Sequence, residues 1–376
     1  MFNKPDLQKN EFMLTGPLRR KGYDWWWHSF TGRNAKTGEE RAFFIEFFVC
    51  NPALGWEKPV LGQLPENRKR GKRPSYLMVK AGTWGEDGTQ LHRFFPWKDV
   101  RLRGKAPYSV SAGDCYASDT VLKGRVDITP EEAKAHPEWM CGSGSLRWEL
   151  LIEKQTAFNV GYGTSHLLRF LKAFEMYWHV EGMKTGYTGS VWYNDEEYII
   201  TPDTCYGYAD KNWGRNFTSP WVWLSSNDLK SNLTDEVLTD SAFDIGGGCP
   251  KIYFVPLKRK LLSAFWYEGI PYEFNFSKFW TLTRTQFDFH ETDDDVFWHV
   301  RQETTRAVMD ANITCHKKDM LLINYEAPDG TKRHNRLWNG GTGTGTISLY
   351  EKSRGTLFLV DEVSAGHIGC EYGEYD

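Results

Sequence analysis

Short apolar and aromatic runs, separated by turn residues, recur along the whole chain. The clearest is AFFIEFFVC, residues 42–50, which follows charged residues and is ended by Asn51-Pro52. Runs of this length between turn residues are typical of β-strands. Others begin near Ser75, Leu146, Gly189, Lys251, Leu261, Asp319 and Gly345. Short turns at 194–195, 268–269, 328–330 and 353–355 predict β-hairpins between such runs.

Helical patterns are few. In TPEEAKAHP, Thr129 can cap a helix that starts at Pro130, and Glu132 completes a capping box. A second run, from Ser165 to Tyr177, places apolar residues on one helical face. Many antiparallel strands with tight turns favour a sandwich or a barrel. We therefore expect an all-β protein with a few short helices.

A polar, glycine-rich stretch crosses the middle of the chain, from Asp228 to Pro250. Stretches of this composition are typical of connections between compact units. The chain has 376 residues and is longer than one average domain. The sequence therefore predicts an N-terminal β-domain over residues 1–228 and a C-terminal β-domain over residues 229–376.

The composition is that of a globular protein, with 40% hydrophobic and 25% charged residues. A net charge of −3 gives no reason to expect a nucleic acid or an anionic membrane as a partner. The sequence lacks both the apolar run of a signal peptide and the ~20 apolar residues of a membrane span. We therefore expect a cytoplasmic protein without an integral membrane segment.

The seven cysteines are scattered singly and form no CxxC pair. An odd number of isolated cysteines argues for free thiols rather than for a disulfide framework or a zinc site. We therefore expect no bound metal.

Aromatic residues make up 15% of the chain, and the segment CYGYADKNWGRNFTSPWVWLSSND, residues 205–228, places charged residues among them. Side chains on a strand alternate between its two faces. If residues 206–213 are extended, one face carries Tyr206, Tyr208, Asp210 and Asn212, and the other carries Lys211 and Trp213.

A carboxyl group among aromatic rings is partly desolvated, which raises its pKa unless a cation or hydrogen bonds hold it down. Such an acid can donate a proton to an alkene, an epoxide or a carbonyl. A structural role is the alternative. Asp210 could anchor a turn, while Lys211 or Trp213 could plug the end of a barrel.

The stretch YADKNWGRNFTSPWVWLSSND resembles the signature segment of the tocopherol cyclase family. The family pattern is Tyr-x-Glu/Asp-Lys-Asn-Trp-Gly and, after a short gap, a proline with two tryptophans and then an asparagine. Residues 23–49 and 186–208 and the C-terminal CEYG are similar to other parts of the family, although Trp25-Trp26-Trp27 departs from its usual opening hairpin. The residues that match the signature are Tyr208, Asp210, Lys211, Asn212, Trp213, Gly214, Trp221, Trp223 and Asn227.

The resemblance implies both a fold and a chemistry. Carotenoid 1,2-hydratases and certain lipocalin-like Diels–Alderases carry a similar segment with His in place of Lys211, so the lysine points to the cyclase branch. The implied fold is two packed lipocalin-like (calycin) antiparallel β-barrels with an apolar ligand cavity. The implied chemistry is a cofactor-free cyclisation of, or addition to, a hydrophobic unsaturated substrate.

The resemblance also assigns roles to the matching residues. Asp210 is expected to give a proton to a double bond. Tyr206 and Tyr208 would hold a substrate hydroxyl or carbonyl, and Lys211 would organise the site. The residues expected to bind the substrate or to support its binding are Trp213, Trp221, Trp223, Asn212 and Asn227.

Two further polar residues are candidates for substrate binding. Glu46 lies within the apolar run 42–50. It supplies a second acid if its face lines the cavity, and it has no special role at an exposed sheet edge. His179 lies two residues before Glu181. On a strand the two could form an acid–base pair, whereas on a loop they are surface residues.

The leading hypothesis is a cofactor-independent cyclase or isomerase that acts on a small prenyl-, phenol- or polyene-like molecule. Three alternatives remain open. The chain could carry a hydrophobic ligand without catalysis, or it could be a hydratase or lyase that adds water to a double bond. The motif could also be structural and lock the two barrels together.

Overall fold

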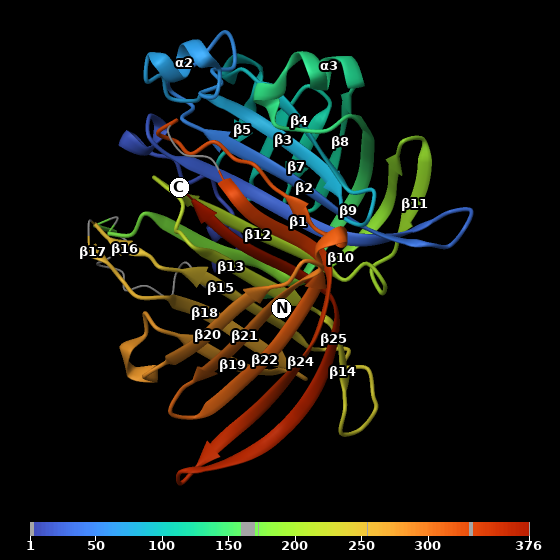
Figure 1. The fold of residues 1–376 in the computed structure, drawn as a ribbon, viewed down its shortest axis with the longest axis vertical. Coiled ribbons are helices and arrows are strands. Elements are labelled where there is room, and N and C mark those ends of the chain that lie inside the picture. Colours follow the sequence, from blue (N-terminus) through green and yellow to red (C-terminus); the bar gives the residue numbers. More distant parts are fainter. Residues whose placement is uncertain (1–3, 159–169, 172, 254, 331–333, 376) are drawn as a thin grey trace.

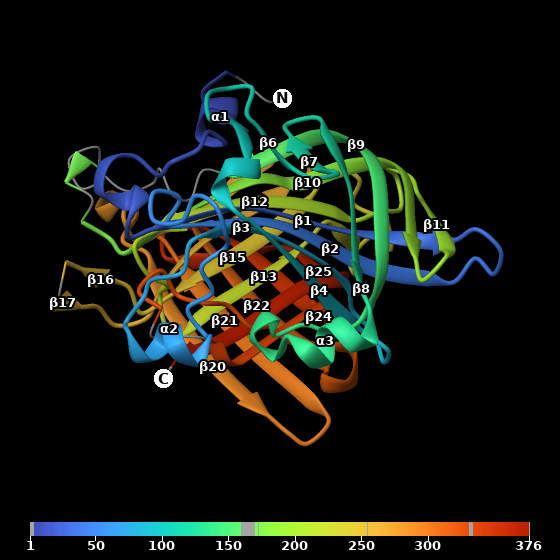
Figure 2. The same ribbon diagram turned by 90° about the horizontal axis from the view of Figure 1, so that it is seen from above.

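Two strongly curved antiparallel β-sheets form most of the molecule. The computed structural model describes residues 4–158, 170–171, 173–253, 255–330 and 334–375. Figure 1 shows the first sheet, coloured blue to green, above the second sheet, coloured yellow to red, and Figure 2 shows the same layers from above. Short helices lie in the connections. This arrangement confirms the predicted all-β architecture of lipocalin-like barrels.

The first sheet spans residues 23–214 and contains twelve strands among the described residues. Its order is β4-β3-β2-β1-β11-β10-β9-β8-β7-β6-β5, and β12 pairs with both β1 and β10. The strands are β1 (Tyr23–Asn34), β2 (Glu40–Cys50), β3 (Tyr76–Thr83), β4 (Thr89–Phe95), β5 (Arg101–Arg103), β6 (Ser109–Ala112), β7 (Cys115–Ser118), β8 (Val121–Ile128), β9 (Gly144–Phe158), β10 (Met176–Tyr193), β11 (Glu196–Ile200) and β12 (Gly207–Gly214).

The second sheet has the order β19-β18-β15-β13-β25-β24-β22-β21-β20, with β14 beside β25 and β23 beside β24. Its strands are β13 (Trp221–Ser226), β14 (Asp228–Ser231), β15 (Ala242–Gly248), β18 (Lys260–Tyr267), β19 (Ile270–Asn275), β20 (Arg284–Glu291), β21 (Asp295–Glu303), β22 (Ala307–His316), β23 (Leu321–Leu322), β24 (His334–Ser353) and β25 (Thr356–Tyr375). A separate small ladder joins β16 (Lys251–Ile252) and β17 (Val255–Pro256).

The hydrogen-bonded ladders change from the first sheet to the second between Gly214 and Trp221, so β13 already belongs to the second sheet. The division of the chain into two domains at residue 228 stays a prediction.

The helices are α1 (Lys4–Lys9), α2 (Pro65–Lys69), α3 (Pro130–Ala135) and the 3-10 turns η1 (Gly16–Arg19), η2 (Trp97–Asp99), η3 (Pro137–Trp139), η4 (Phe279–Thr281) and η5 (Lys317–Asp319). None of the described helices has the length and apolar character that a membrane crossing requires. The predicted capping box is present, because Thr129 and Glu132 each accept a hydrogen bond from the other's backbone N–H, at 3.1 and 2.9 Å.

Several local predictions can be compared with the structure. The run 42–50 lies in β2, and tight turns join β10 to β11, β18 to β19 and β24 to β25 at the predicted positions. Most of the helix predicted from Ser165 falls outside the described residues. Its expected end at Tyr177 is wrong, because Met176 and Tyr177 already belong to β10.

Three clusters of buried side chains form the core. One fills the concave side of the first sheet, and its largest members include Trp26 and Trp148. A second fills the second sheet around Trp298. The third lies between the sheets and combines residues of both, such as Trp27 and Trp223. The interface between the sheets is therefore built like a protein interior.

The core of the first sheet contains a buried ion pair. Lys211 of β12 binds Asp24 of β1, and both side chains are fully buried. The Lys211 ammonium also lies 3.9 Å from the centroid of the Trp26 ring. Burial raises the pKa of Asp24 to about 6, although the charge and hydrogen bond of Lys211 pull it down. Each charge thus depends on the other to remain in the core.

This dependence makes the substitution Lys211→Met destabilising. We expect a loss of about 3–5 kcal/mol in the free energy of unfolding, because Asp24 keeps its place in the core without a counter-ion. The double variant Asp24→Asn/Lys211→Met should recover most of that loss. Urea unfolding of the three proteins measures both values, and a single variant as stable as the unmodified protein would contradict the prediction.

Candidate active site

One row of side chains crosses the first sheet on the face that is turned toward the second sheet. Asp210 of β12 lies opposite Trp27 of β1. Trp27 in turn lies opposite Glu46 of β2, and Glu46 lies opposite Lys80 of β3. Directly opposed residues of an antiparallel sheet share a face, so these four side chains point the same way. All four are buried.

A second row crosses the facing side of the second sheet. Glu371 of β25 lies between Trp223 of β13 and Asn339 of β24. The Asn339 amide donates a hydrogen bond to Glu371 Oε2 at 2.7 Å. Its Oδ1 accepts one at 2.9 Å from the indole of Trp84, which directly follows β3 in the first half of the chain. Hydrogen bonds therefore tie the second row to the first sheet.

A small cavity, which we call the acid chamber, lies between the two rows. Its volume is about 30 Å³, which is room for one or two water molecules. Asp210 enters it from the first sheet and Glu371 from the second. The other lining residues are Trp25, Trp27, Met176, Trp221, Trp223 and Tyr325. Two carboxyl groups thus share one space with several aromatic rings.

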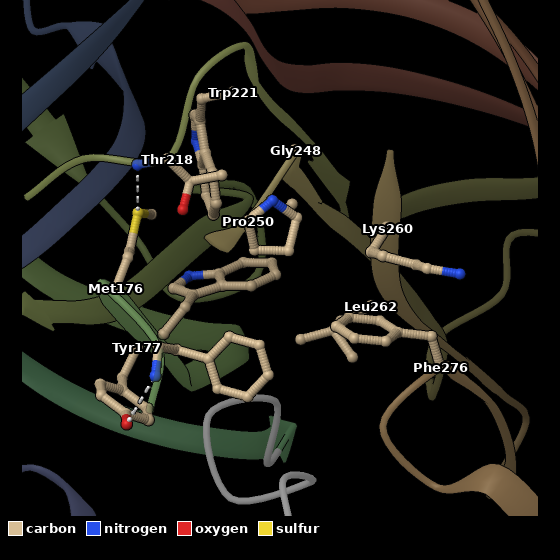
Figure 3. Close-up of a pocket in the computed structure, with 12 residues that line it drawn as sticks. Met176, Tyr177, Thr218, Trp221, Gly248, Pro250, Lys260, Leu262 and Phe276 are labelled. Carbon is tan, nitrogen blue, oxygen red and sulfur yellow. Dashed lines mark hydrogen bonds between the residues drawn. The ribbon is translucent and has the colours of Figure 1, made fainter. Parts of the chain in front are cut away.

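A second cavity, the apolar chamber, adjoins the first. It has a volume of about 60 Å³, and Met176 and Trp221 line both chambers. In Figure 3, Met176 and Tyr177 lie on one side of it, with Leu262 and Phe276 on the other. The shared residues place an apolar space directly beside the acidic one.

Hydrogen bonds occupy one oxygen of Asp210. Its Oδ2 accepts from the Trp178 indole at 2.7 Å and from the Tyr208 hydroxyl at 3.3 Å. Within the described residues, Oδ1 has no hydrogen-bond partner. A proton on this carboxyl group is therefore best placed on Oδ1, where it faces no competing donor.

Burial is the main reason that the pKa of Asp210 is raised to about 8, and the Trp178 hydrogen bond offsets only part of this effect. The carboxylates of Glu181 and Glu371 raise the pKa as well. The residue is only 8% exposed. Asp210 is thus a neutral acid at pH 7, which is the state that a proton donor needs.

Glu371 is partly buried, and its pKa differs from that of Asp210. Burial raises its pKa to about 7, while the Asn339 hydrogen bond and the charge of Lys80 lower it. Near neutral pH, Glu371 is therefore present both as a carboxylic acid and as a carboxylate. The two carboxyl groups of the chamber differ in the protonation state that they favour.

Several predicted residues lie where the motif suggested. Tyr208 shares the face of Asp210 and packs against Trp223, with ring centroids 5.0 Å apart. Trp221 and Trp223 line the acid chamber. Asn212 lies on the same face of β12 but accepts a hydrogen bond from the Tyr23 hydroxyl at 2.7 Å, so its carbonyl oxygen is used within the protein.

Tyr206 does not belong to this row. The sequence predicted an extended chain from Tyr206, but β12 begins at Gly207 and Tyr206 has a φ of +47°. This backbone conformation takes Tyr206 out of the strand alternation. Its ring stacks on His367 instead, with centroids 3.9 Å apart. The expected placement of Tyr206 beside Asp210 is therefore wrong.

Three other predicted residues lie on the opposite face of the first sheet. Lys211 and Trp213 alternate with Asp210 along β12, and His179 of β10 lies opposite Lys211. Lys211 binds Asp24 in the core. The His179–Glu181 segment is a strand rather than a loop. The thickness of the sheet separates these side chains from the acid chamber.

Glu46 and Asn227 act on the site indirectly. Glu46 pairs with Lys80 at 3.1 Å and accepts a 2.7 Å hydrogen bond from the hydroxyl of Tyr325, which lines the acid chamber. The Asn227 amide donates to the backbone carbonyls of Met183 and Gly207 at 3.0 and 2.9 Å. Asn227 thus holds β10 and the start of β12 to the second sheet.

The sequence did not point to Trp178, Tyr325 or Glu371 as members of the site. Trp178 and Tyr325 carry no local signal, because their contacts join segments far apart in the chain. Glu371 lies in the C-terminal CEYG, where only a general similarity was visible. Strand alternation within Trp25-Trp26-Trp27 could have revealed that the first and third rings face away from the second.

Comparison with known proteins gives the family. One solved structure similar to this chain is a candidate AttH from Nitrosomonas europaea, with 11% sequence identity and a TM-score of 0.49. The similarity covers 99% of this chain and 96% of the AttH chain. Kievitone hydratase from Nectria haematococca has 12% identity and a TM-score of 0.47, over 97% and 95% of the two chains. No curated protein matches the sequence. The family model described as tocopherol cyclase-like matches residues 109–373, and the chain therefore belongs to the tocopherol cyclase-like family.

Proposed function

We propose that the protein is a cofactor-independent enzyme that protonates a carbon–carbon double bond of a hydrophobic substrate, in a cyclisation or isomerisation. The observation that carries this proposal is the placement of Asp210. A buried carboxylic acid, neutral at pH 7, lies in the wall of a chamber beside aromatic rings, with one oxygen held by two donors. Membership of the tocopherol cyclase-like family supports the same class of reaction.

The chemical step moves one proton. The Oδ1–H bond of Asp210 breaks and a C–H bond forms at one alkene carbon, which leaves an aspartate and a carbocation. The π faces of Trp25, Trp27 and Trp223 line the space in which this positive charge would develop. The Trp178 and Tyr208 hydrogen bonds to Oδ2 would stabilise the carboxylate that forms.

The apolar chamber would hold the hydrocarbon part of the substrate. Its walls include Leu262 and Phe276, and it adjoins the acid chamber at Met176 and Trp221. The two cavities, about 60 and 30 Å³, are smaller than the sites that usually enclose a small organic ligand. Substrate binding therefore requires side chains to move, and Met176 and Trp221 lie where that movement would join the chambers.

Hydration of a double bond is a second candidate function. The acid chamber has room for one or two water molecules next to Asp210 Oδ1, and the Trp27 indole N–H is also buried without a partner among the described residues. Water placed there could add to a carbocation. A cyclase and a hydratase would use the same acid and differ in the nucleophile.

Asp210→Asn should slow turnover strongly and retain ligand binding, because the amide keeps the shape of the side chain and has no acidic proton. We expect a rate loss of about 10²- to 10⁴-fold. A panel of prenylated phenols and polyenes serves as probes, with binding followed by tryptophan fluorescence. Solvent labelled with ¹⁸O separates the two reactions, because only a hydratase incorporates the label. Binding without turnover by the unmodified protein would indicate a carrier.

The pKa of Asp210, raised to about 8 in the folded protein from its ordinary value of 3.8, also predicts a pH effect on stability. Between these values the folded chain keeps a proton that the unfolded chain has lost, so this group lowers stability as pH rises from about 4 to 8. Asp210→Asn removes this pH-dependent loss of stability, because the amide does not titrate. The variant should gain stability relative to the unmodified protein by about 1 kcal/mol per pH unit in this range.

Urea unfolding at several pH values measures this difference. The matched control is Asp235→Asn, because Asp235 is exposed and its substitution should change the pH dependence little. Equal pH slopes for Asp210→Asn and the unmodified protein would show that Asp210 is ionised in the folded state.

Leu262→Trp should fill the apolar chamber and weaken substrate binding. We expect KM to rise about tenfold or more with a small change in kcat, because the acid chamber stays intact. Leu322→Trp, at an exposed leucine outside both chambers, is the control. An unchanged KM in Leu262→Trp would place the hydrocarbon chain elsewhere.

A further inference from the structure

The acid chamber contains a second carboxyl group that the proton donor does not explain. We propose that Glu371 is the base of the reaction, which takes the proton from the substrate hydroxyl group as that group adds to the carbocation. This inference rests on the proposed function, because it concerns the step that follows protonation by Asp210. The acid, Asp210, then belongs to the first sheet and the base, Glu371, to the second.

The position of Glu371 supports this role. It lies in the same small cavity as Asp210 but comes from the facing sheet. A substrate group between the sheets would therefore have an acid on one side and a carboxylate on the other. This is the arrangement that an addition across a double bond requires, since one atom gains a proton while another loses one.

The contacts of Glu371 hold it in a fixed orientation. Asn339 donates to Oε2 at 2.7 Å, and the Trp84 indole holds the Asn339 amide at 2.9 Å. Among the described residues this hydrogen bond involves Oε2 and not Oε1, so Oε1 is the oxygen on which we place the proton. Asn339 is 1% exposed, so its amide cannot turn freely toward water. Asn339 is on this basis a positioning residue, which acts through Glu371.

The groups around Glu371 suit a base that is ionised part of the time. Lys80 of the facing sheet supplies positive charge, but Glu46 binds it directly at 3.1 Å. Glu371 is therefore stabilised as a carboxylate only in part, because burial and the nearby charge of Glu46 both raise its pKa. A base must give up its proton again after each turnover, and a strongly paired carboxylate would not accept one.

The reaction balances without an additional reagent. Asp210 loses one proton to the alkene carbon, the substrate O–H bond breaks as the C–O bond forms, and Glu371 Oε1 receives the hydroxyl proton. The product is an isomer of the substrate. Transfer of one proton from Glu371 back to Asp210, directly or through a water in the emptied chamber, restores the starting state.

Glu371→Gln tests the assignment with hydroxylated prenyl arenes as substrates. We expect cyclisation to slow by about 10²- to 10⁴-fold. In D₂O the variant should still exchange deuterium into recovered substrate, because Asp210 can protonate the alkene and take a proton back. Asp210→Asn should lose both cyclisation and exchange. A failure of the proposed function, with no exchange in any variant, is thus distinct from a failure of this inference.

The control is Glu362→Gln, the same change at an exposed position of β25, which should leave both rates unchanged. Asn339→Ala should slow cyclisation less than Glu371→Gln and shift the low-pH limb of its rate profile. Cyclisation by Glu371→Gln within threefold of the unmodified rate would overturn the proposal.

A second measurement needs no substrate. The carboxyl pKa of Asp210 can be followed by NMR in protein labelled with ¹³C at aspartate carboxyl groups. If Glu371 faces Asp210 as a carboxylate, Glu371→Gln should lower the pKa of Asp210, because a like charge is removed. Glu362→Gln should not. An Asp210 titration that is the same in all three proteins would also overturn the proposal.

Discussion

The cost of removing carboxyl groups from water between two packed sheets is the constraint on which the site depends. Asp210, Glu371 and Glu46 all lie in or beside this interface. Among the residues that the structure describes, Lys80 is the buried cation on this face, and Glu46 binds it at 3.1 Å. An isolated ionised carboxylate is too costly in such a place, so the remaining acids tend to hold protons. Asp210 and Glu371 thus hold protons because the buried carboxyl groups at the interface outnumber the cation that could neutralise them.

The adjacent pair Asp210-Lys211 shows how this imbalance is maintained. In an isolated loop the two charges would neutralise each other. In β12 they point to opposite faces, and Lys211 instead compensates Asp24 in the core of the first sheet. One dipeptide therefore supplies a counter-ion to the barrel core and an unneutralised acid to the interface, and the sheet between them keeps the roles apart.

Much of the fold followed from the sequence, because turn residues and apolar runs are local signals. The face of β12 that carries Asp210 also followed from alternation. The location of the cavity could not be predicted from the sequence. Every residue of β3 and β12 is buried, so both faces look alike in sequence, and no pattern tells a barrel core from an interface. The predicted position of Tyr206 was wrong for a local reason, because its φ is positive. The role of Glu371 was missed for a long-range reason, because it reaches the site only through the packing of the two sheets.

Large buried side chains occupy the interior of each of the two sheets among the described residues. A lipocalin-like carrier would hold its ligand inside one barrel, where interior side chains leave room. Here Trp26 and Trp148 are fully buried within the first sheet and Trp298 is 2% exposed within the second. The acid chamber arises instead where the outer faces of two sheets meet. A site at this interface takes side chains from both sheets. Two carboxyl groups with different protonation states can therefore lie close together, because each sheet buries only one of them.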